Sequence, residues 1–79
     1  MLSELQTARY IVGLKQSLKK IHGGEAKKAF VAENASPRVT DEVTAACETA
    51  GVPVEWVPDM NELGRACGID VGAAVAVVY

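Results

Sequence analysis

The spacing of apolar positions changes along the chain, and each change predicts a new element. Leu14, Leu18 and Ile21 recur at helical spacing, which predicts a helix that buries one stripe and ends at residues 22–24. Leu2 and Leu5 suggest a short amphipathic helix before it, followed by a brief apolar run at residues 10–12. Further helical stripes occupy residues 39–50 and 59–67. Apolar runs at residues 29–32, 52–57 and 73–79 predict buried strands, the last one covered on both faces.

Turn and capping residues mark where the predicted helices begin and end. Ser36 is placed to cap a helix that starts at Pro37, and Gly51 closes that helix. Asp59 can accept from the first turn of the next helix while Glu62 reaches back, as in a capping box.

Strands alternate with helices, which favours an α/β fold: a three-layer α/β/α sandwich with a small mixed sheet. With 79 residues, short connections and no internal repeat or linker, residues 1–79 are expected to form a single domain. A chain this small has little core to give up to a large cleft, so its size favours a binding module. We expect a monomer.

The charge is unevenly distributed. The net charge is −2, but residues 1–38 hold seven Lys or Arg against three acids, whereas residues 39–79 hold one Arg against seven acids. Such a division can place a basic face, able to attract a polyanion, on an acidic protein. It is equally compatible with two solvated surfaces of opposite sign.

The cysteine content and the chain start favour a cytoplasmic protein. Cys47 and Cys67 form no CxxC motif, and the single His cannot complete a zinc site. No signal-peptide pattern and no apolar stretch of membrane-spanning length is present. We therefore expect buried, reduced thiols, no membrane association, no metal and no cofactor.

Catalytic chemistry finds little support. His22 is the only histidine, and a surface position at a helix end explains it better than a role as general base. No serine has a nearby His partner or the strand–Gly-x-Ser-x-Gly–helix setting of a nucleophile. A small enzyme using Cys67 is the weakest alternative, because a small buried residue explains that position.

The glycine-rich segment 64–72 predicts a sharply turning loop after the third helical stripe. Gly64, Gly68 and Gly72 match neither a dinucleotide fingerprint nor a P-loop. Ile69 and Val71 are exposed there unless the loop folds back on the core. If exposed, they form an apolar ledge for an unstacked base or for a protein partner.

The segment at residues 13–20 carries the most information about function. Gly13 directly precedes a helix N-terminus, where backbone N–H groups and the helix dipole favour an anion. Lys15 lies in the first turn, where the dipole disfavours a cation, which hints at an external anion. Lys15, Gln16 and Lys19 can share one face, and their side chains can donate to base edges. An ordinary solvated Lys-rich helix face is the alternative.

The segments 13–19, 32–37 and, above all, 63–71 (Leu-Gly-Arg-Ala-Cys-Gly-Ile-Asp-Val) resemble the family of archaeal ribosomal protein L7Ae, and its small bacterial relatives most of all. The resemblance covers essentially the whole chain in the right order. It implies an α/β/α sandwich that binds kink-turn RNA, a duplex bent sharply at a three-nucleotide bulge beside tandem sheared G·A pairs.

The resemblance also implies three contacts. The family pattern Gly-x-Asn-Glu-x-x-Lys opens a helix that enters the major groove at the G·A pairs, and Lys and Gln replace its Asn and Glu here. The loop at residues 69–71 packs on the bulged nucleotides, and the loop at residues 32–37 makes the third contact. The implied RNA-binding residues are Gly13, Leu14, Lys15, Gln16, Lys19, Asn34, Ser36, Ile69, Asp70 and Val71.

The sequence therefore predicts a non-catalytic protein that recognises kink-turns in ribosomal or regulatory RNA and stabilises their bent form, as a ribosome-associated or riboswitch-stabilising factor. The kink opens a major groove that ordinary A-form RNA hides from side chains, which gives such selectivity a physical basis. The alternative from another class is a protein–protein adaptor that uses the apolar loop at residues 69–71.

Overall fold

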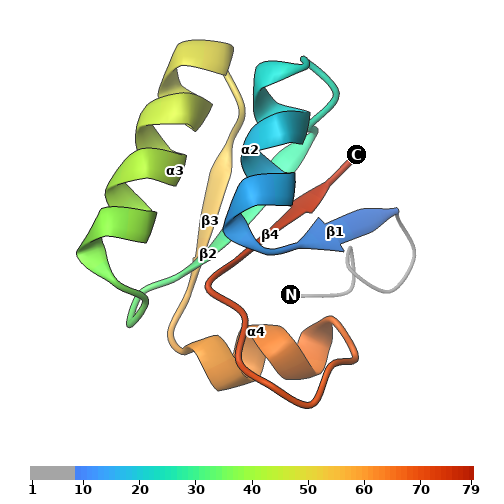
Figure 1. Cartoon of the computed structure of the whole chain (residues 1–79), viewed down its shortest axis with the longest axis vertical. Helices are drawn as coiled ribbons and strands as arrows, with labels where there is room; N and C mark the ends of the chain where they lie inside the picture. Colours follow the sequence, from blue (N-terminus) through green and yellow to red (C-terminus); the bar gives the residue numbers. More distant parts are fainter. Residues whose placement is uncertain (1–8) are drawn as a thin grey trace.

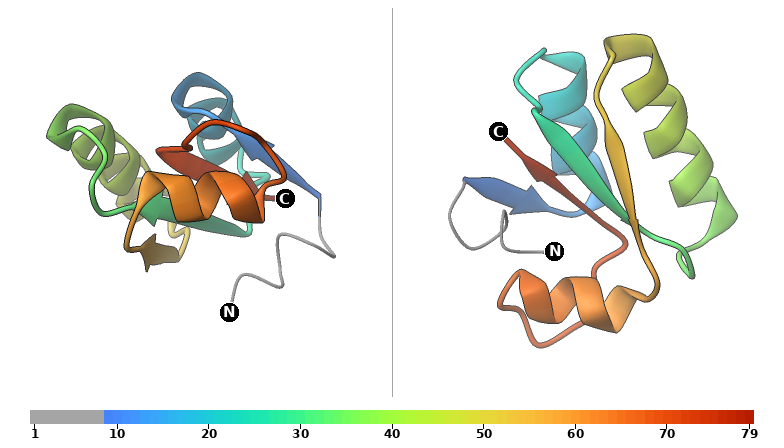
Figure 2. Two further views of the ribbon diagram at one scale, coloured as in Figure 1. Left: turned by 90° about the horizontal axis from the view of Figure 1, so that it is seen from below. Right: turned by 180° about the vertical axis from the view of Figure 1, so that it is seen from behind.

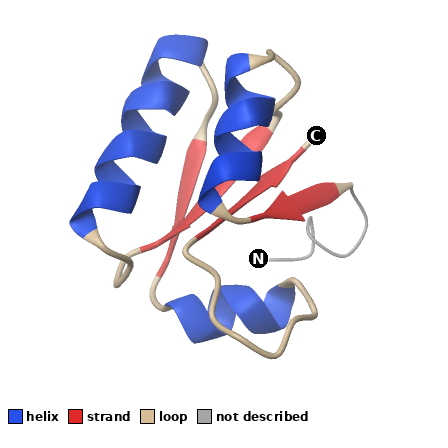
Figure 3. Ribbon diagram, in the orientation of Figure 1, coloured by secondary structure: helices blue, strands red, loops and turns tan. Residues whose placement is uncertain are grey.

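The computed structural model describes residues 9–79, which form a four-stranded sheet and three helices (Figure 3). The strands are β1 (Tyr10–Val12), β2 (Lys28–Ala32), β3 (Val54–Val57) and β4 (Val75–Val78). The helices are α2 (Leu14–His22), α3 (Pro37–Ala50) and α4 (Met60–Ala66). The amphipathic helix expected around Leu2 and Leu5 lies outside the described residues.

The sheet is mixed, with the order β1-β4-β2-β3. β2 and β3 are parallel, and β4 runs antiparallel to both β1 and β2. The carboxyl ends of β1, β2 and β3 therefore meet at one edge of the sheet, where β4 begins (Figure 1). This edge is called the carboxyl edge below.

Two helices cover one face of the sheet and one helix covers the other, which confirms the predicted three-layer α/β/α arrangement. α2 and α3 lie side by side on one face, and α4 lies against the opposite face near the carboxyl edge (Figures 1 and 2). Successive side chains of each strand point to opposite faces of the sheet, so the same strands contribute residues to a core on each face. The core under α2 and α3 contains Ile21, Ala29, Val31, Val43, Ala46, Cys47, Val75 and Val77, and the core under α4 contains Phe30, Ala32, Ala35, Val57, Leu63, Cys67, Ala73, Ala76 and Val78.

Some predicted boundaries were wrong by one or two residues. The strand predicted from residue 52 begins only at Val54, because Pro53 has no N–H to donate to the sheet, although its carbonyl accepts from the Ala29 N–H at 3.0 Å. The strand predicted from residue 73 begins at Val75, because the N–H of Ala73 donates to the Met60 carbonyl of α4 instead. All four residues of β4 are buried, as expected for a strand covered on both faces.

The predicted stripe of α2 packs against the core, whereas one predicted cap needs correction. Ile21 is fully buried, Leu14 and Leu18 are partly buried and pack against the core under α2 and α3, and Ser17 of the same helix is also fully buried. Ser36 occupies the N-cap position before Pro37, but its side chain forms no capping hydrogen bond. Its backbone carbonyl accepts from the first turn instead.

Candidate nucleic-acid interface

The three segments singled out in the sequence meet at the carboxyl edge of the sheet. The Gly13 N–H, at the start of α2, donates to the carbonyl of Val75 at 3.0 Å. The first residue of the loop at residues 33–36 donates to the Val57 carbonyl at 2.8 Å, and Ala32 donates to the Ala74 carbonyl at 2.9 Å. Seen from below, the starts of α2 and α3, the helix α4 and the loop at residues 67–74 all lie toward the viewer (Figure 2, left). Sheet order, not sequence proximity, brings them together.

The N-terminus of α2 has no cap from a side chain. Gly13 occupies the N-cap position with φ 107°, which an L side chain rarely adopts. No side chain of residues 9–79 bonds the first turn, and no acidic residue lies in it. The backbone N–H groups of Leu14, Lys15 and Gln16 therefore point out of the helix with the positive end of its dipole.

The other two helices leave fewer of these backbone N–H groups without a partner. In α4 the Asp59 carboxylate accepts from Asn61 and Glu62 at 2.6 and 3.2 Å, which confirms the predicted Asp59 cap, whereas the Glu62 side chain forms no hydrogen bond back to Asp59. The side-chain oxygen of Asn34 accepts from the remaining first-turn amide, that of Met60, at 2.8 Å.

α3 begins with Pro37, which has no N–H, and its Val39 N–H donates to the Ser36 carbonyl at 2.9 Å, so of its first three residues only Arg38 keeps an unused amide. Among the helices of residues 9–79, α2 thus offers the largest set of first-turn amides to an external acceptor.

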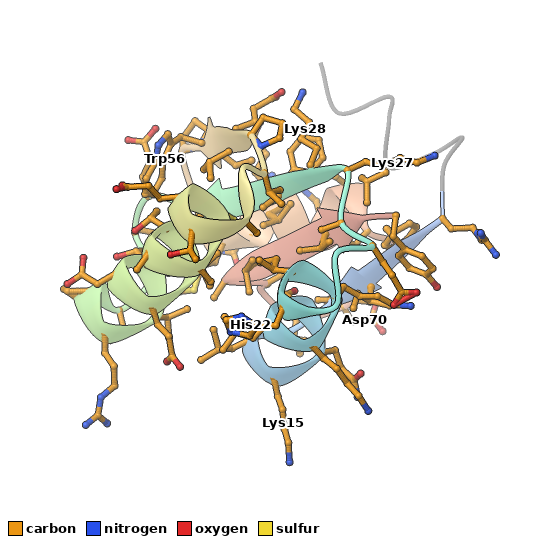
Figure 4. The ribbon with its side chains drawn as sticks, turned by 90° about the horizontal axis from the view of Figure 1, so that it is seen from above. Lys15, His22, Lys27, Lys28, Trp56 and Asp70 are labelled. Atoms are coloured by element: carbon orange, nitrogen blue, oxygen red, sulfur yellow. The ribbon has the colours of Figure 1, made fainter. Side chains whose placement is uncertain are left out.

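The polar side chains of the first two turns of α2 point into solvent. Lys15, Gln16 and Lys19 are all exposed, and Lys15 extends away from the body of the protein (Figure 4). Neither lysine forms an ion pair or a hydrogen bond with a side chain of residues 9–79, whereas Lys20 pairs with Glu25 at 3.3 Å. Lys15 and Lys19 are therefore available for an external anion.

The loop at residues 33–36 is fixed to α4 through Asn34. Because its side-chain oxygen caps Met60, one predicted RNA-binding residue also has a structural role that the sequence did not reveal. Its partner lies 26 positions away, and no local pattern signals such a contact. Ser36, the other predicted residue of this loop, is exposed.

The loop at residues 67–74 folds back tightly over α4. A Cβ on Gly64 would overlap the carbonyl oxygen of Val71, and one on Gly72 would lie 3.1 Å from the Cβ of Met60. The Ile69 N–H donates to the Gly64 carbonyl at 3.0 Å. The Tyr10 hydroxyl donates to the Cys67 carbonyl at 2.6 Å, a contact across 57 positions that the sequence did not suggest.

This folding separates the two apolar residues that the sequence placed on one ledge. Ile69 is partly buried and packs against the core under α4, so for this residue the alternative of a loop folded back on the core holds. Val71 is 70% exposed and Asp70 is also exposed. The loop thus presents one apolar side chain, Val71, rather than a pair.

The described residues do not assemble a catalytic or metal centre. Both cysteines are free and buried, and burial raises the pKa of the Cys47 and Cys67 thiols. Raised pKa values disfavour the reactive thiolate, which argues against the Cys67 enzyme. No group of three potential metal ligands occurs within residues 9–79. No helix in this part of the chain is both long and apolar enough to cross a bilayer.

The sequence profile of the ribosomal protein L7Ae/L30e/S12e/Gadd45 family matches residues 2–79. This chain belongs to that family. The L7Ae-family resemblance and the α/β/α fold expected from it are thereby confirmed, as is the expectation of a non-enzymatic protein.

Small bacterial proteins of similar length are close relatives of this L7Ae-family chain. RNA-binding protein YbxF of Geobacillus stearothermophilus is 42% identical over 74 residues, which cover 94% of this chain and 90% of that protein. RNA-binding protein TTE2299 of Caldanaerobacter subterraneus is 37% identical over 75 residues, covering 95% and 92%.

Solved structures share the fold. A protein of unknown function from Bacillus halodurans aligns with TM-score 0.87 and 25% identity over 98% of this chain and 81% of its own. The Giardia lamblia 15.5kD RNA binding protein aligns with TM-score 0.83 and 33% identity over 98% of this chain, which spans 63% of the Giardia chain.

Proposed function

We propose that this protein binds RNA through the carboxyl edge of its sheet, and that its target is a kink-turn. The observation that carries the proposal is the uncapped start of α2, where three outward-facing amides lie beside exposed Lys15 and Lys19. Relatives named as RNA-binding proteins support the same conclusion. In this proposal the RNA contacts are made by Gly13, Leu14, Lys15, Gln16, Lys19, Asn34, Ser36, Asp70 and Val71, and Ile69 supports the loop that carries the last two.

The start of α2 would provide both affinity for the RNA backbone and recognition of the bases. Backbone amides at a helix N-terminus and nearby lysines suit a phosphate oxygen, which sets register without reading sequence. Gln16 and Lys19, on the exposed face, would donate to base edges in the opened groove at the G·A pairs. This division of labour favours a distorted RNA, because a regular A-form groove does not admit the helix.

The loop at residues 67–74 would provide the second contact, to the bulged nucleotides. Val71 is its exposed apolar residue, and the backbone around it is held in place by close packing on Gly64. Ile69 would act from beneath, because its side chain packs on the core and fixes the loop's position. A preformed loop binds with less ordering entropy than a flexible one.

Binding would stabilise the bent RNA by mass action, since only the bent form offers both contacts at once. Ribosomal RNA and riboswitches are the classes of target in which such a bend matters. The proposal assigns the protein a monomeric, non-catalytic role in the cytoplasm.

The test is a titration of fluorescein-labelled RNA followed by anisotropy at two salt concentrations. One RNA contains a kink-turn, and the control replaces its tandem G·A pairs by Watson–Crick pairs. Lys19→Ala should weaken binding to the kink-turn by about 1–3 kcal/mol and reduce the preference over the control. Lys27→Ala, a second exposed lysine, is the matched control for the lost charge.

Equal affinity for the two RNAs would overturn kink-turn recognition while leaving general RNA binding in place. Equal losses from Lys19→Ala on both RNAs would make Lys19 a plain phosphate contact. No binding of either RNA at low salt would overturn the proposal as a whole.

A further inference from the structure

An exposed tryptophan lies at the open side of the sheet, away from the proposed RNA contacts of α2. Trp56 is the only tryptophan of the chain, is 45% exposed and lies on β3, an edge strand of the sheet. Figure 4 shows it on the opposite side of the molecule from Lys15. Tryptophan is enriched among the residues that contribute most to protein interfaces, so Trp56 is a candidate contact for a ligand.

Trp56 lines a shallow hollow of about 500 Å³ together with Glu33 and Thr40. Val31 of β2 pairs with Trp56, and Glu33 lies two residues after Val31, just past the end of β2, where its N–H still donates to the Val57 carbonyl at 2.8 Å. Thr40 comes from the first turn of α3, which packs on the face of the sheet that carries Val31.

The hollow offers hydrogen-bond acceptors. The Glu33 carboxylate has no hydrogen bond or ion pair with any of residues 9–79. The Thr40 hydroxyl donates to the Pro37 carbonyl at 3.1 Å, which leaves its oxygen lone pairs free to accept. A fitting ligand therefore donates hydrogen bonds, carries positive charge and has a flat face for the indole. A guanidinium group meets all three requirements.

The surrounding charge also favours a cation over a nucleic acid. Residues 39–64 contain no Lys or Arg, while six acids lie within this stretch. Arg38 precedes Thr40 by two positions on α3, so the two side chains do not share a face. Lys28 is paired with Glu55 at 2.7 Å, on the face of the sheet opposite Trp56. A phosphate chain would meet repulsion here.

The backbone of β3 offers an open edge beside the hollow. The carbonyl of Pro53 accepts from Ala29 of β2 at 3.0 Å, and that of Val57 accepts from Glu33, directly after β2, at 2.8 Å, so the backbone at these positions faces the sheet. The N–H and carbonyl groups of Val54 and Trp56 therefore face outward, where an extended segment can pair with them.

We propose that the open edge of β3 binds an extended segment of a partner protein. An arginine of that segment stacks on Trp56 and donates hydrogen bonds to Glu33 and Thr40. Directly opposed residues of neighbouring strands point to the same face, so the arginine is the residue paired with Trp56. Main-chain hydrogen bonds to β3 provide affinity, and the hollow provides specificity for arginine at the position opposite Trp56. The proposal does not depend on RNA binding.

The single tryptophan makes the test specific. The probe is the peptide acetyl-Thr-Val-Arg-Val-Thr-amide, titrated against the protein while Trp56 fluorescence is recorded. We expect a saturable change in fluorescence. The same peptide with citrulline, an uncharged isostere of arginine, should bind about tenfold more weakly or worse.

Glu33→Gln should weaken binding of the arginine peptide by a similar factor. The matched control is Glu42→Gln, which removes the same charge from an exposed position two residues beyond Thr40 on α3 and hence on another face. Circular dichroism checks that both variants are folded. Trp56→Phe, followed with a fluorescein-labelled peptide, should retain weaker binding because Phe stacks on cations less well than Trp.

Three outcomes would overturn the proposal. The first is equal binding of the arginine and citrulline peptides, and the second is an equal effect of Glu33→Gln and Glu42→Gln. The third is that single-stranded guanosine pentanucleotide changes Trp56 fluorescence and displaces the peptide, which would make the hollow a base-stacking site. Because these titrations contain no kink-turn RNA, their failure is distinct from a failure of the proposed function.

Discussion

The side-chain oxygen of Asn34 lies 2.8 Å from the backbone nitrogen of Met60 and accepts its hydrogen bond. One side chain thus links the loop after β2 to the start of α4 on the other face of the sheet. The two loops in the proposed interface share this attachment, because Met60 also accepts from Ala73 through its carbonyl at 3.0 Å.

Asn34→Ala is therefore expected to lower the free energy of unfolding by about 1 kcal/mol, the usual cost of losing a helix cap. Urea denaturation followed by circular dichroism measures the change. Asn34→Asp is the control, since aspartate keeps the acceptor oxygen and adds a negative charge that the helix N-terminus favours. If Asn34→Asp lowers the free energy of unfolding as much as Asn34→Ala does, the capping role is contradicted.

Gly64 allows the loop at residues 67–74 to lie directly on α4. Gly64→Ala should destabilise the protein by about 1–3 kcal/mol and displace Val71, because the added Cβ overlaps the Val71 carbonyl. Kink-turn affinity should fall as well. The measurements are thermal unfolding and RNA anisotropy.

Gly51→Ala provides a matched glycine control. Gly51 has φ 72° and open space around its Cβ position, at the end of α3. Alanine there should cost about 1–2 kcal/mol of stability from backbone strain without altering RNA affinity. If both variants weaken RNA binding equally, the effect of Gly64→Ala reflects stability and not the position of the loop.

Serine substitutions at Ile69 and Val71 should distinguish a residue that supports the loop from one that contacts the RNA. Ile69→Ser removes a partly buried side chain from the core under α4 and should lower stability by about 1–3 kcal/mol. Val71→Ser changes an exposed side chain and should alter stability by less than about 0.5 kcal/mol while weakening kink-turn binding severalfold.

Val71→Ile, which keeps an apolar side chain, should retain RNA affinity. Unchanged affinity in Val71→Ser, together with loss of a protein partner, would support the adaptor alternative at this loop instead.

The two buried thiols should make stability fall at alkaline pH. Burial raises the pKa of Cys47 and Cys67 in the folded protein, so above about pH 8.5 the unfolded chain releases protons that the folded protein keeps. Folding then binds protons, and the free energy of unfolding decreases with rising pH until the folded-state pKa values are reached.

The measurement is urea unfolding between pH 7 and 10. The double variant Cys47→Ala/Cys67→Ala should be less stable at pH 7 but should lose less stability on alkalisation. An identical pH dependence in both proteins would assign the effect to other groups.

Much of the fold follows from local patterns in the sequence. Alternation in β2 and β4 places Val31 and Val75 in one core and Phe30 and Ala76 in the other, and each strand's apolar run already signals burial on both faces. Helical spacing located α2, α3 and α4, and Asp59 indicated a cap that the structure contains. These features depend on residues within a few positions of one another, which is the range over which backbone geometry and capping act.

Only the tertiary structure decided which of these parts meet. The order β1-β4-β2-β3 brings Gly13 beside Val75, turns Ile69 into the core and places Glu33 next to Trp56. Such contacts depend on strand order and on the apolar burial gained by the whole chain, and neither is expressed in local spacing. The sequence by itself thus determined the elements and the chemistry they carry, whereas the sheet determined which side chains form an interface and which support it.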